Sequence, residues 1–226
     1  FMVGITPYSD IGYDFSSVET DPQIIGQTGN ISYDSYGTGS VYQLFAGAGV
    51  TFWKRLSLGA EVIYYFGNLD KVTQMNYSSS SYRSLNSGSD LLVRGTTGKF
   101  GLQYEQKLGG DVSMIIGATY KMSTSMKGTS LNYRYATQDG VLDTLKHDNV
   151  ELRKAGLRFA DEIGVGISVK GGEKWSAEVN YLRSDWRNCG FDTANGFSVI
   201  SDTEKFTSTV SQSFRAGFEI VPNRND

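Results

Sequence analysis

Hydrophobic and polar residues alternate along residues 41–66. Every second residue from Tyr42 to Phe52 is apolar, and so is every second residue from Leu56 to Phe66. Because successive side chains of a strand point to opposite faces, this period of two predicts two β-strands. The basic pair Lys54-Arg55 predicts a tight turn between them, so the stretch predicts an antiparallel hairpin. An apolar face about ten residues long with aromatic ends is also typical of a strand that faces lipid.

Further strand-like segments, apolar in residues 1–8 and alternating in the others, bring the expected number of strands to about eight. These segments are residues 1–8, 92–104, 112–122, 163–170, 175–181 and 214–220. Short turns are expected at Lys54, Gly109 and Gly171, and long polar loops at residues 9–39, 67–90, 123–150 and 187–205. Outer-membrane barrels sort their connections in this way, with short periplasmic turns and long outer loops. The sequence therefore predicts an all-β fold, an antiparallel up-and-down transmembrane β-barrel.

Each phase of the alternation has its own expected environment. The apolar phase predicts lipid-facing side chains at Leu44, Val50, Leu58, Val62, Ile116, Ile167, Val179 and Phe218. The opposite phase predicts lumen-facing side chains at Phe45, Glu61, Ile63, Tyr65, Lys99, Gln103, Glu105, Lys121, Glu162, Glu178, Arg215 and Glu219. Because charges of both signs occur here, internal salt bridges are favoured over a channel lining. The apolar members of this phase favour a hydrophobic ligand.

Arg94 falls on the apolar phase, which is unexpected for a strand in a membrane. An arginine on the lipid face costs about 2–4 kcal/mol at the bilayer midplane and close to nothing near the interface. We expect Arg94 at the loop end of its strand, where its guanidinium can reach water.

Alternation alone leaves a soluble fold open. In a β-sandwich or a lipocalin-like binding protein the same apolar residues would point inward, and Glu61, Lys99 and Glu178 would point to solvent. The sorting of the loops, the aromatic strand ends and the glycine-rich polar phase favour the membrane interpretation.

Composition narrows the function classes. A chain of 226 residues fits one domain, residues 1–226, and the net charge of -3 argues against nucleic acid as a partner. One histidine, His147, and one cysteine, Cys189, give no pattern for a metal site or a disulfide. No nucleophile or phosphate-binding motif occurs, so we predict no enzyme activity, no catalytic residue and no cofactor. The chain has no run of eighteen apolar residues, so the sequence predicts no helical membrane span.

Several segments resemble the FadL/TodX-like (OMPP1-type) outer-membrane transporter family, in particular its members from Bacteroidetes. The resemblance lies in residues 4–13, 56–60, 163–167, 175–181 and 214–222. It implies a barrel of roughly fourteen strands in the outer membrane of a Gram-negative bacterium. It also implies that this chain is an internal piece truncated at both ends, without the family's N-terminal plug and the last strands.

The resemblance implies passive transport of hydrophobic small molecules, such as long-chain fatty acids, with outer-membrane lipid as the surroundings. The alternative is a structural or docking barrel that binds a surface or periplasmic protein. A continuous apolar path through the lumen favours transport, whereas a lumen closed by salt bridges beneath a large ordered surface favours docking.

Overall fold

The computed structural model describes residues 1–191 and 207–221, which form one short helix and a series of β-strands. The strands are β1 (Met2–Asp10), β2 (Tyr13–Val18), β3 (Ile31–Phe52), β4 (Leu56–Tyr77), β5 (Ser84–Gly109), β6 (Val112–Lys121), β7 (Thr124–Ser125), β8 (Lys127–Gln138), β9 (Val141–Glu151), β10 (Arg158–Phe159), β11 (Glu162–Gly171), β12 (Trp175–Asp185) and β13 (Val210–Ile220). The predicted loop at residues 187–205 lies mostly outside the described residues.

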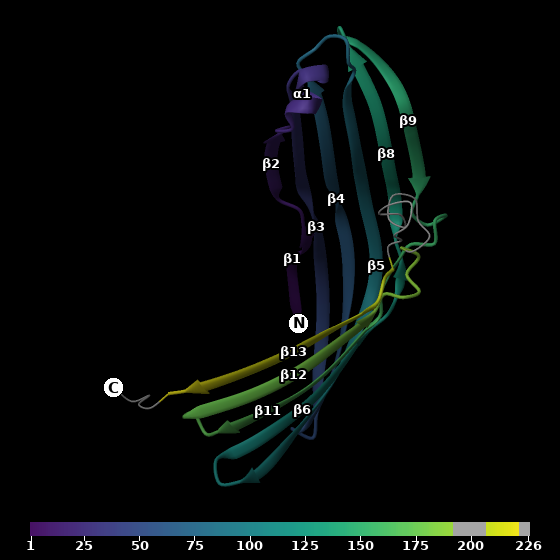
Figure 1. The fold of residues 1–226 in the computed structure, drawn as a ribbon. Helices are drawn as coiled ribbons and strands as arrows, with labels where there is room; N and C mark the ends of the chain where they lie inside the picture. Colours follow the sequence, from purple (N-terminus) through teal and green to yellow (C-terminus); the bar gives the residue numbers. More distant parts are fainter. Residues whose placement is uncertain (192–206, 222–226) are drawn as a thin grey trace.

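Eight of these strands lie side by side in the order β1-β3-β4-β5-β6-β11-β12-β13, each antiparallel to its neighbour. They curve into an open half-barrel (Figure 1). Each of these eight strands overlaps one of the eight segments predicted as strands. The predicted fold class, an all-β up-and-down barrel, is confirmed.

Strands β3, β4 and β5 are much longer than predicted, at 22, 22 and 26 residues. Their upper halves continue beyond the half-barrel and pair with β2, β8 and β9 (Figure 1). We call this upper sheet the wall: β2, β8, β9 and residues 31–41, 67–77 and 84–94. The sheet forks at β5, which pairs with β6 in its lower half and with β8 in its upper half.

Three of the predicted long loops are therefore wrong. Residues 67–90 are mostly strand, residues 123–150 contain β7, β8 and most of β9, and residues 9–39 contain β2 and the start of β3. The wall has polar residues on both faces, as in Ser87-Gly88-Ser89, because water reaches both sides of it. A strand that is wetted on both faces has no apolar period, so its sequence resembles that of a loop.

Glycines mark the boundary between the wall and the half-barrel. Gly39, Gly67 and Gly128 adopt φ values of +110°, +150° and +119° on three different strands. A Cβ on Gly67 would lie 2.1 Å from the Ser40 carbonyl oxygen, and one on Gly128 would lie 2.0 Å from the Leu92 carbonyl oxygen. Only glycine fits this combination of positive φ and close backbone approach.

The lower ends of the strands are joined by short turns, as predicted. The first turn comprises three residues, Trp53 to Arg55, and not the predicted pair alone. Trp53 and Lys54 have positive φ, and the Arg55 N–H donates a hydrogen bond to the Phe52 carbonyl at 3.0 Å. Residues 110–111 and 172–174 make the other two lower turns.

The helix α1 (Pro22–Thr28) lies at the upper end of the wall (Figure 1). Asp21 caps it by accepting a hydrogen bond from the Gln23 N–H at 2.8 Å. Among the described residues, no helix is long and apolar enough to cross a membrane.

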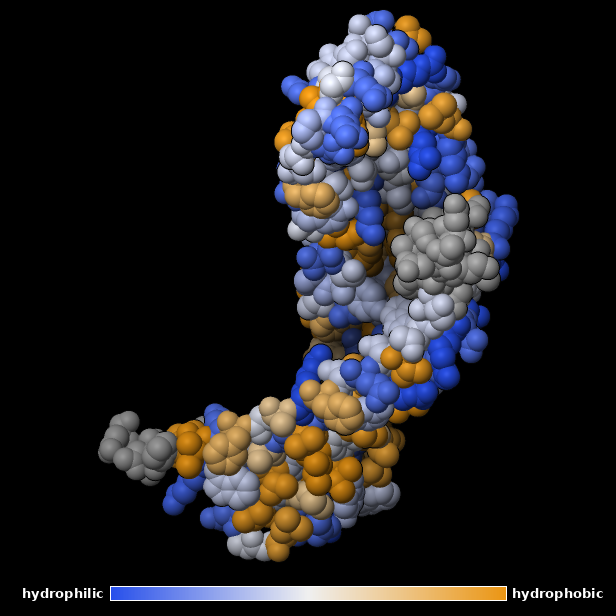
Figure 2. Space-filling view, in the orientation of Figure 1, coloured by the Kyte–Doolittle hydropathy of each residue, from blue (hydrophilic) through white to orange (hydrophobic). Residues whose placement is uncertain are grey.

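Hydrophobic side chains gather on the lower part of the molecule, over β6 and β11 to β13, whereas the wall above is mostly hydrophilic (Figure 2). On the outer face of β3 and β4, stacked aromatic rings mark the upper edge of this apolar band. The ring centroids of Tyr42 and Phe66 are 6.0 Å apart, and those of Tyr64 and Phe66 are 5.8 Å apart. Aromatic residues at the edge of an apolar band are typical of a membrane interface.

Candidate functional site

The predicted lipid-facing residues all lie on one face of the half-barrel, which we call the outer face. Cross-strand pairs such as Val50–Leu58 and Ile116–Ile167 place them together. Their side chains are exposed, from 42% for Ile167 to 70% for Phe218. So large an apolar surface is stable only against another apolar medium.

The predicted lumen-facing residues lie on the opposite, inner face. The upper members meet in one place: Phe45 is paired with Ile63, and Glu61 with Lys99. The others lie lower and apart from this group, namely Gln103, Glu105, Glu178, Arg215 and Glu219. Of these, Glu178 accepts a hydrogen bond from Asn180, and Glu219 accepts one from Ser176 at 3.4 Å.

Tyr65 is the centre of the upper group and is 0% exposed. Its ring stacks on Phe159 with centroids 4.3 Å apart, and Tyr8 packs edge-on against it at 4.8 Å. The inner core around it consists of Val41, Ile63, Tyr65, Val93, Met126, Leu152, Leu157 and Phe159. An apolar cluster thus covers the inner face where the wall and the half-barrel meet.

Two short strands carry the covering side chains inward. Among the described residues, β7 and β10 pair only with each other. In the sequence, β7 lies between β6 and β8, and β10 lies between β9 and β11. Gly95 on β5 makes room for them, because a Cβ there would lie 2.8 Å from the Phe159 ring. The segment that contains β7 and β10 therefore folds over the inner face of β5 at this level.

Sequence reasoning missed Phe159, Leu152, Leu157 and Met126 as members of this site. They belong to segments with strands of only two residues, which are too short to show a period. Tyr8, at the end of the strand expected over residues 1–8, lies within β1 and packs into the core. The only signal at these positions was hydrophobicity within a polar stretch.

A row of charges lies directly below the inner core. The cross-strand order is Glu61, Lys99, Lys121 and Glu162. Glu162 accepts a hydrogen bond from Lys121 Nζ at 3.3 Å and forms an ion pair with Lys99 Nζ at 3.6 Å. Lys121 also lies over the Tyr8 ring, 5.7 Å from its centroid. The Lys121 side chain is only 8% exposed, and these partners offset the cost of burying its charge.

Below the charges, the inner face becomes smooth. Gly49, Gly59, Gly101, Thr119 and Gly164 follow one another across five strands. They help to line a cavity of about 720 Å³. Small side chains leave this part of the lumen open, in contrast to the filled level above.

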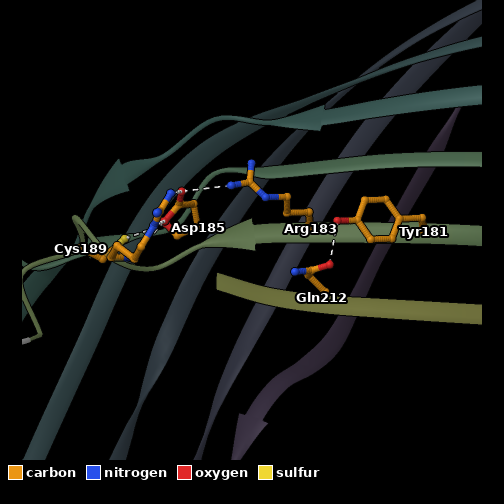
Figure 3. A network of polar contacts seen from close by, with 6 residues as sticks. Tyr181, Arg183, Asp185, Cys189 and Gln212 are labelled. Atoms are coloured by element: carbon orange, nitrogen blue, oxygen red, sulfur yellow. Dashed lines mark hydrogen bonds and ion pairs between the residues drawn. The ribbon is translucent and has the colours of Figure 1, made fainter. Parts of the chain in front are cut away.

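A second polar network holds the upper end of β12 (Figure 3). Asp185 Oδ2 lies 2.5 Å from Arg187 Nη2 and 3.4 Å from Arg183 Nη2. The hydrogen bonds from Arg187 lower the pKa of the Asp185 carboxyl to about 2. Cys189 is buried, and its thiol donates to the Asp185 carbonyl at 3.6 Å. The network fixes the chain where it leaves the strand.

His147 stands exposed on β9, and no group of three metal-binding side chains occurs among the residues that the structure describes. On the inner face, a level that is filled by aromatic rings and ion pairs lies above an open level that is lined by glycines.

The crystal structure of the toluene transporter TbuX from Ralstonia pickettii is similar to this chain, with a TM-score of 0.55 and 16% sequence identity. The match covers 84% of this chain and 61% of TbuX, so the chain spans less than two thirds of that protein. At this identity the likeness shows the barrel fold. No curated protein sequence matches the chain.

The model of the BamG family matches residues 1–226. The family and the barrel fold place the protein in the outer membrane of a Gram-negative bacterium, as the sequence predicted. The soluble alternative is therefore wrong, and the exposed apolar outer face of the half-barrel agrees with a membrane location. The chain belongs to the BamG family.

Proposed function

We propose that the protein is a docking barrel without enzymatic activity, which holds another protein of the outer membrane against its wall. The inner core and the Glu162 ion pairs support this proposal, because they fill the inner face at the level where a transport path would enter. The family name BamG suggests that the partner belongs to the barrel-assembly (BAM) complex.

The outer face of the wall has the chemistry of a protein-binding surface. Tyr36, Val72, Gly88 and Tyr133 form one cross-strand row, and Tyr135 stacks on Tyr133 with centroids 5.7 Å apart. Tyr133 lies over Gly88, and burial raises the pKa of its hydroxyl. Rigid tyrosines combine large contact area with a polar group, which suits them to protein interfaces. This row is the observation that carries the proposal.

Site-specific photocrosslinking in native outer membranes tests it. A crosslinker at Tyr36 or Tyr135 should trap a protein of the BAM complex, and one at the lipid-facing Val62 should not. Tyr135→Ser should weaken copurification with that complex while the barrel still folds. Equal crosslinking from all three positions, or copurification that survives Tyr135→Ser together with Tyr36→Ser, would refute docking through this row.

Transport of hydrophobic small molecules is the second candidate, and the cavity of about 720 Å³ beside the glycine row supports it. The likeness to a toluene transporter is in keeping with such a role. Under this hypothesis, removing the ring of Phe159 should speed the uptake of a hydrophobic probe into vesicles, because the ring covers the inner face at Gly95. Uptake that matches that of empty vesicles, in both the native protein and Phe159→Ala, would leave docking as the function.

A further inference from the structure

Arg94 and Lys127 stand directly opposite each other on β5 and β8. Both are exposed, whereas Val93 and Gly95 on either side of Arg94 are buried on the inner face. The two cations therefore share the outer face. Their position is also inside the sheet, because β5 continues ten residues above Arg94, so the prediction that Arg94 ends its strand is wrong.

Two like charges in directly opposed positions repel each other, because their Cβ atoms are only about 5 Å apart. Among the residues that the structure describes, no carboxylate lies within ion-pair distance of either cation. Glu151 lies one row away, paired with Thr129, but its carboxylate binds Lys154 Nζ at 3.0 Å. The fold thus keeps an uncompensated cationic pair on its surface.

A third cation adds to this charge. Arg158 is exposed on β10, where it pairs with Ser125, two residues before Lys127. Its Nε donates to the Ser123 hydroxyl at 3.1 Å, a neutral partner. We call Arg94, Lys127 and Arg158 the cationic cluster.

The cluster lies at the edge of the apolar band. Arg94 is the cross-strand neighbour of Phe66, which belongs to the aromatic stack with Tyr42 and Tyr64. The tight turns lie at the opposite end of these strands, so this edge belongs to the outer surface of the membrane. The headgroups of the outer leaflet are therefore at the height of the cluster.

We propose that the cationic cluster binds the phosphate groups of a phosphorylated glycolipid in the outer leaflet. The guanidinium groups of Arg94 and Arg158 can bind phosphate oxygens in a bidentate manner, and Lys127 supplies a further donor opposite Arg94. The acyl chains then lie along the apolar band below Phe66. This inference concerns the lipid shell and does not depend on the docking or transport role of the barrel.

The test uses the full chain, purified in a neutral detergent and titrated with bisphosphorylated lipid A. The double variant Arg94→Gln/Lys127→Gln should bind this lipid about tenfold more weakly, since each cation contributes separately to binding an anionic lipid. The control is Lys54→Gln/Arg55→Gln, which removes two cations at the lower turn and should leave the affinity unchanged. Dephosphorylated lipid A and inorganic phosphate are the comparison ligands.

A second readout does not depend on the double variant folding. Without lipid, Lys127→Gln should melt at the same temperature as the native protein or higher, because it relieves the repulsion of Arg94. With lipid A, the same variant should gain less thermal stability than the native protein. Equal binding by variant and native protein would overturn the proposal. So would binding of dephosphorylated lipid A as strong as that of the phosphorylated form, and phosphate binding as tight as lipid binding would identify a site for a free anion instead.

Discussion

Tyr65 shows how one residue joins the wall, the half-barrel and the inward strands. Its ring touches Phe159 from β10 and Tyr8 from β1. Its hydroxyl is buried and, within the part of the chain that the structure describes, has no hydrogen-bond partner. The ring and the hydroxyl should therefore act on stability in opposite directions.

Tyr65→Ala should lower the free energy of unfolding by about 3–5 kcal/mol, because it opens a cavity in the inner core. Tyr65→Phe should leave stability unchanged or raise it by about 1–3 kcal/mol, since it removes an unsatisfied buried hydroxyl. Urea titration of the barrel in lipid vesicles, followed by tryptophan fluorescence, measures both. A Tyr65→Phe variant as unstable as Tyr65→Ala would show that the hydroxyl has a partner.

Gly95 and Gly101 form a matched pair on the inner face of β5. A Cβ on Gly95 would lie 2.8 Å from the Phe159 ring, whereas one on Gly101 would have its nearest neighbour, Thr119, at 3.9 Å. Gly95→Ala should therefore cost about 1–3 kcal/mol through overpacking, and Gly101→Ala should cost little. The same urea titration compares them, and equal losses would mean that Phe159 does not cover Gly95.

The Asp185 carboxyl gives a pH dependence with a definite sign. Its pKa is lowered to about 2 in the folded protein, against about 3.9 for an unperturbed aspartate. Its contribution to stability is thus present above about pH 4 and is lost as the pH falls through about 2. Melting temperatures of the native protein and Asp185→Asn should differ at pH 7 and converge near pH 2. A difference that stays constant over this range would contradict the pairing with Arg187.

At the scale of elements, the boundary between wall and half-barrel depends on backbone conformation. Gly67 has a φ of +150° and lies against the Ser40 carbonyl, whereas Gly59 on the same strand has ordinary space around it. Gly67→Ala should loosen the pairing of residues 67–77 with their neighbours and raise amide hydrogen exchange there. Gly59→Ala is the control and should leave exchange unchanged. Protection that persists in Gly67→Ala would show that the wall tolerates a different bend.

Strands were predictable wherever one face meets an apolar medium. Residues 41–66 alternate because lipid lies on one side and the lumen on the other, and the predicted hairpin formed. Residues 84–90 in β5 are equally extended, but both faces carry polar residues, so their sequence indicates a loop. The length of a strand outside the membrane therefore could not be predicted from its hydrophobic pattern.

The sequence predicted which strand residues lie on the inner face, but not which side chains from distant segments cover it. Alternation placed Glu61, Lys99, Lys121 and Glu162 on one face, and strand register brings them into one row. Phe159 reaches Tyr65 through a contact between residues far apart in sequence. Such a contact depends on the path of the whole chain, so no local pattern indicates it.

At the scale of the whole molecule, the positions of the apolar band and the wall predict which residues a reagent outside the cell can reach. In a Cys189→Ala background, a membrane-impermeant maleimide should label Val141→Cys, at the exposed upper tip of the β8–β9 hairpin, in intact cells. It should not label Val62→Cys, which faces lipid, or Trp53→Cys, which lies at the lower turn. All three should react after unfolding in urea. Labelling of Trp53→Cys in intact cells would show that the barrel is inserted the other way round.

Strand β5 also determines how far the protein stands out of the membrane. Its 26 residues extend over about 85 Å at 3.3 Å per residue, or roughly 60 Å in height if the strand is tilted by about 45°. The apolar band of a barrel takes up about 25 Å of this height. Roughly 35 Å of continuous sheet then projects from the membrane. This height is enough to hold the proposed binding surface clear of the sugar chains on the cell exterior.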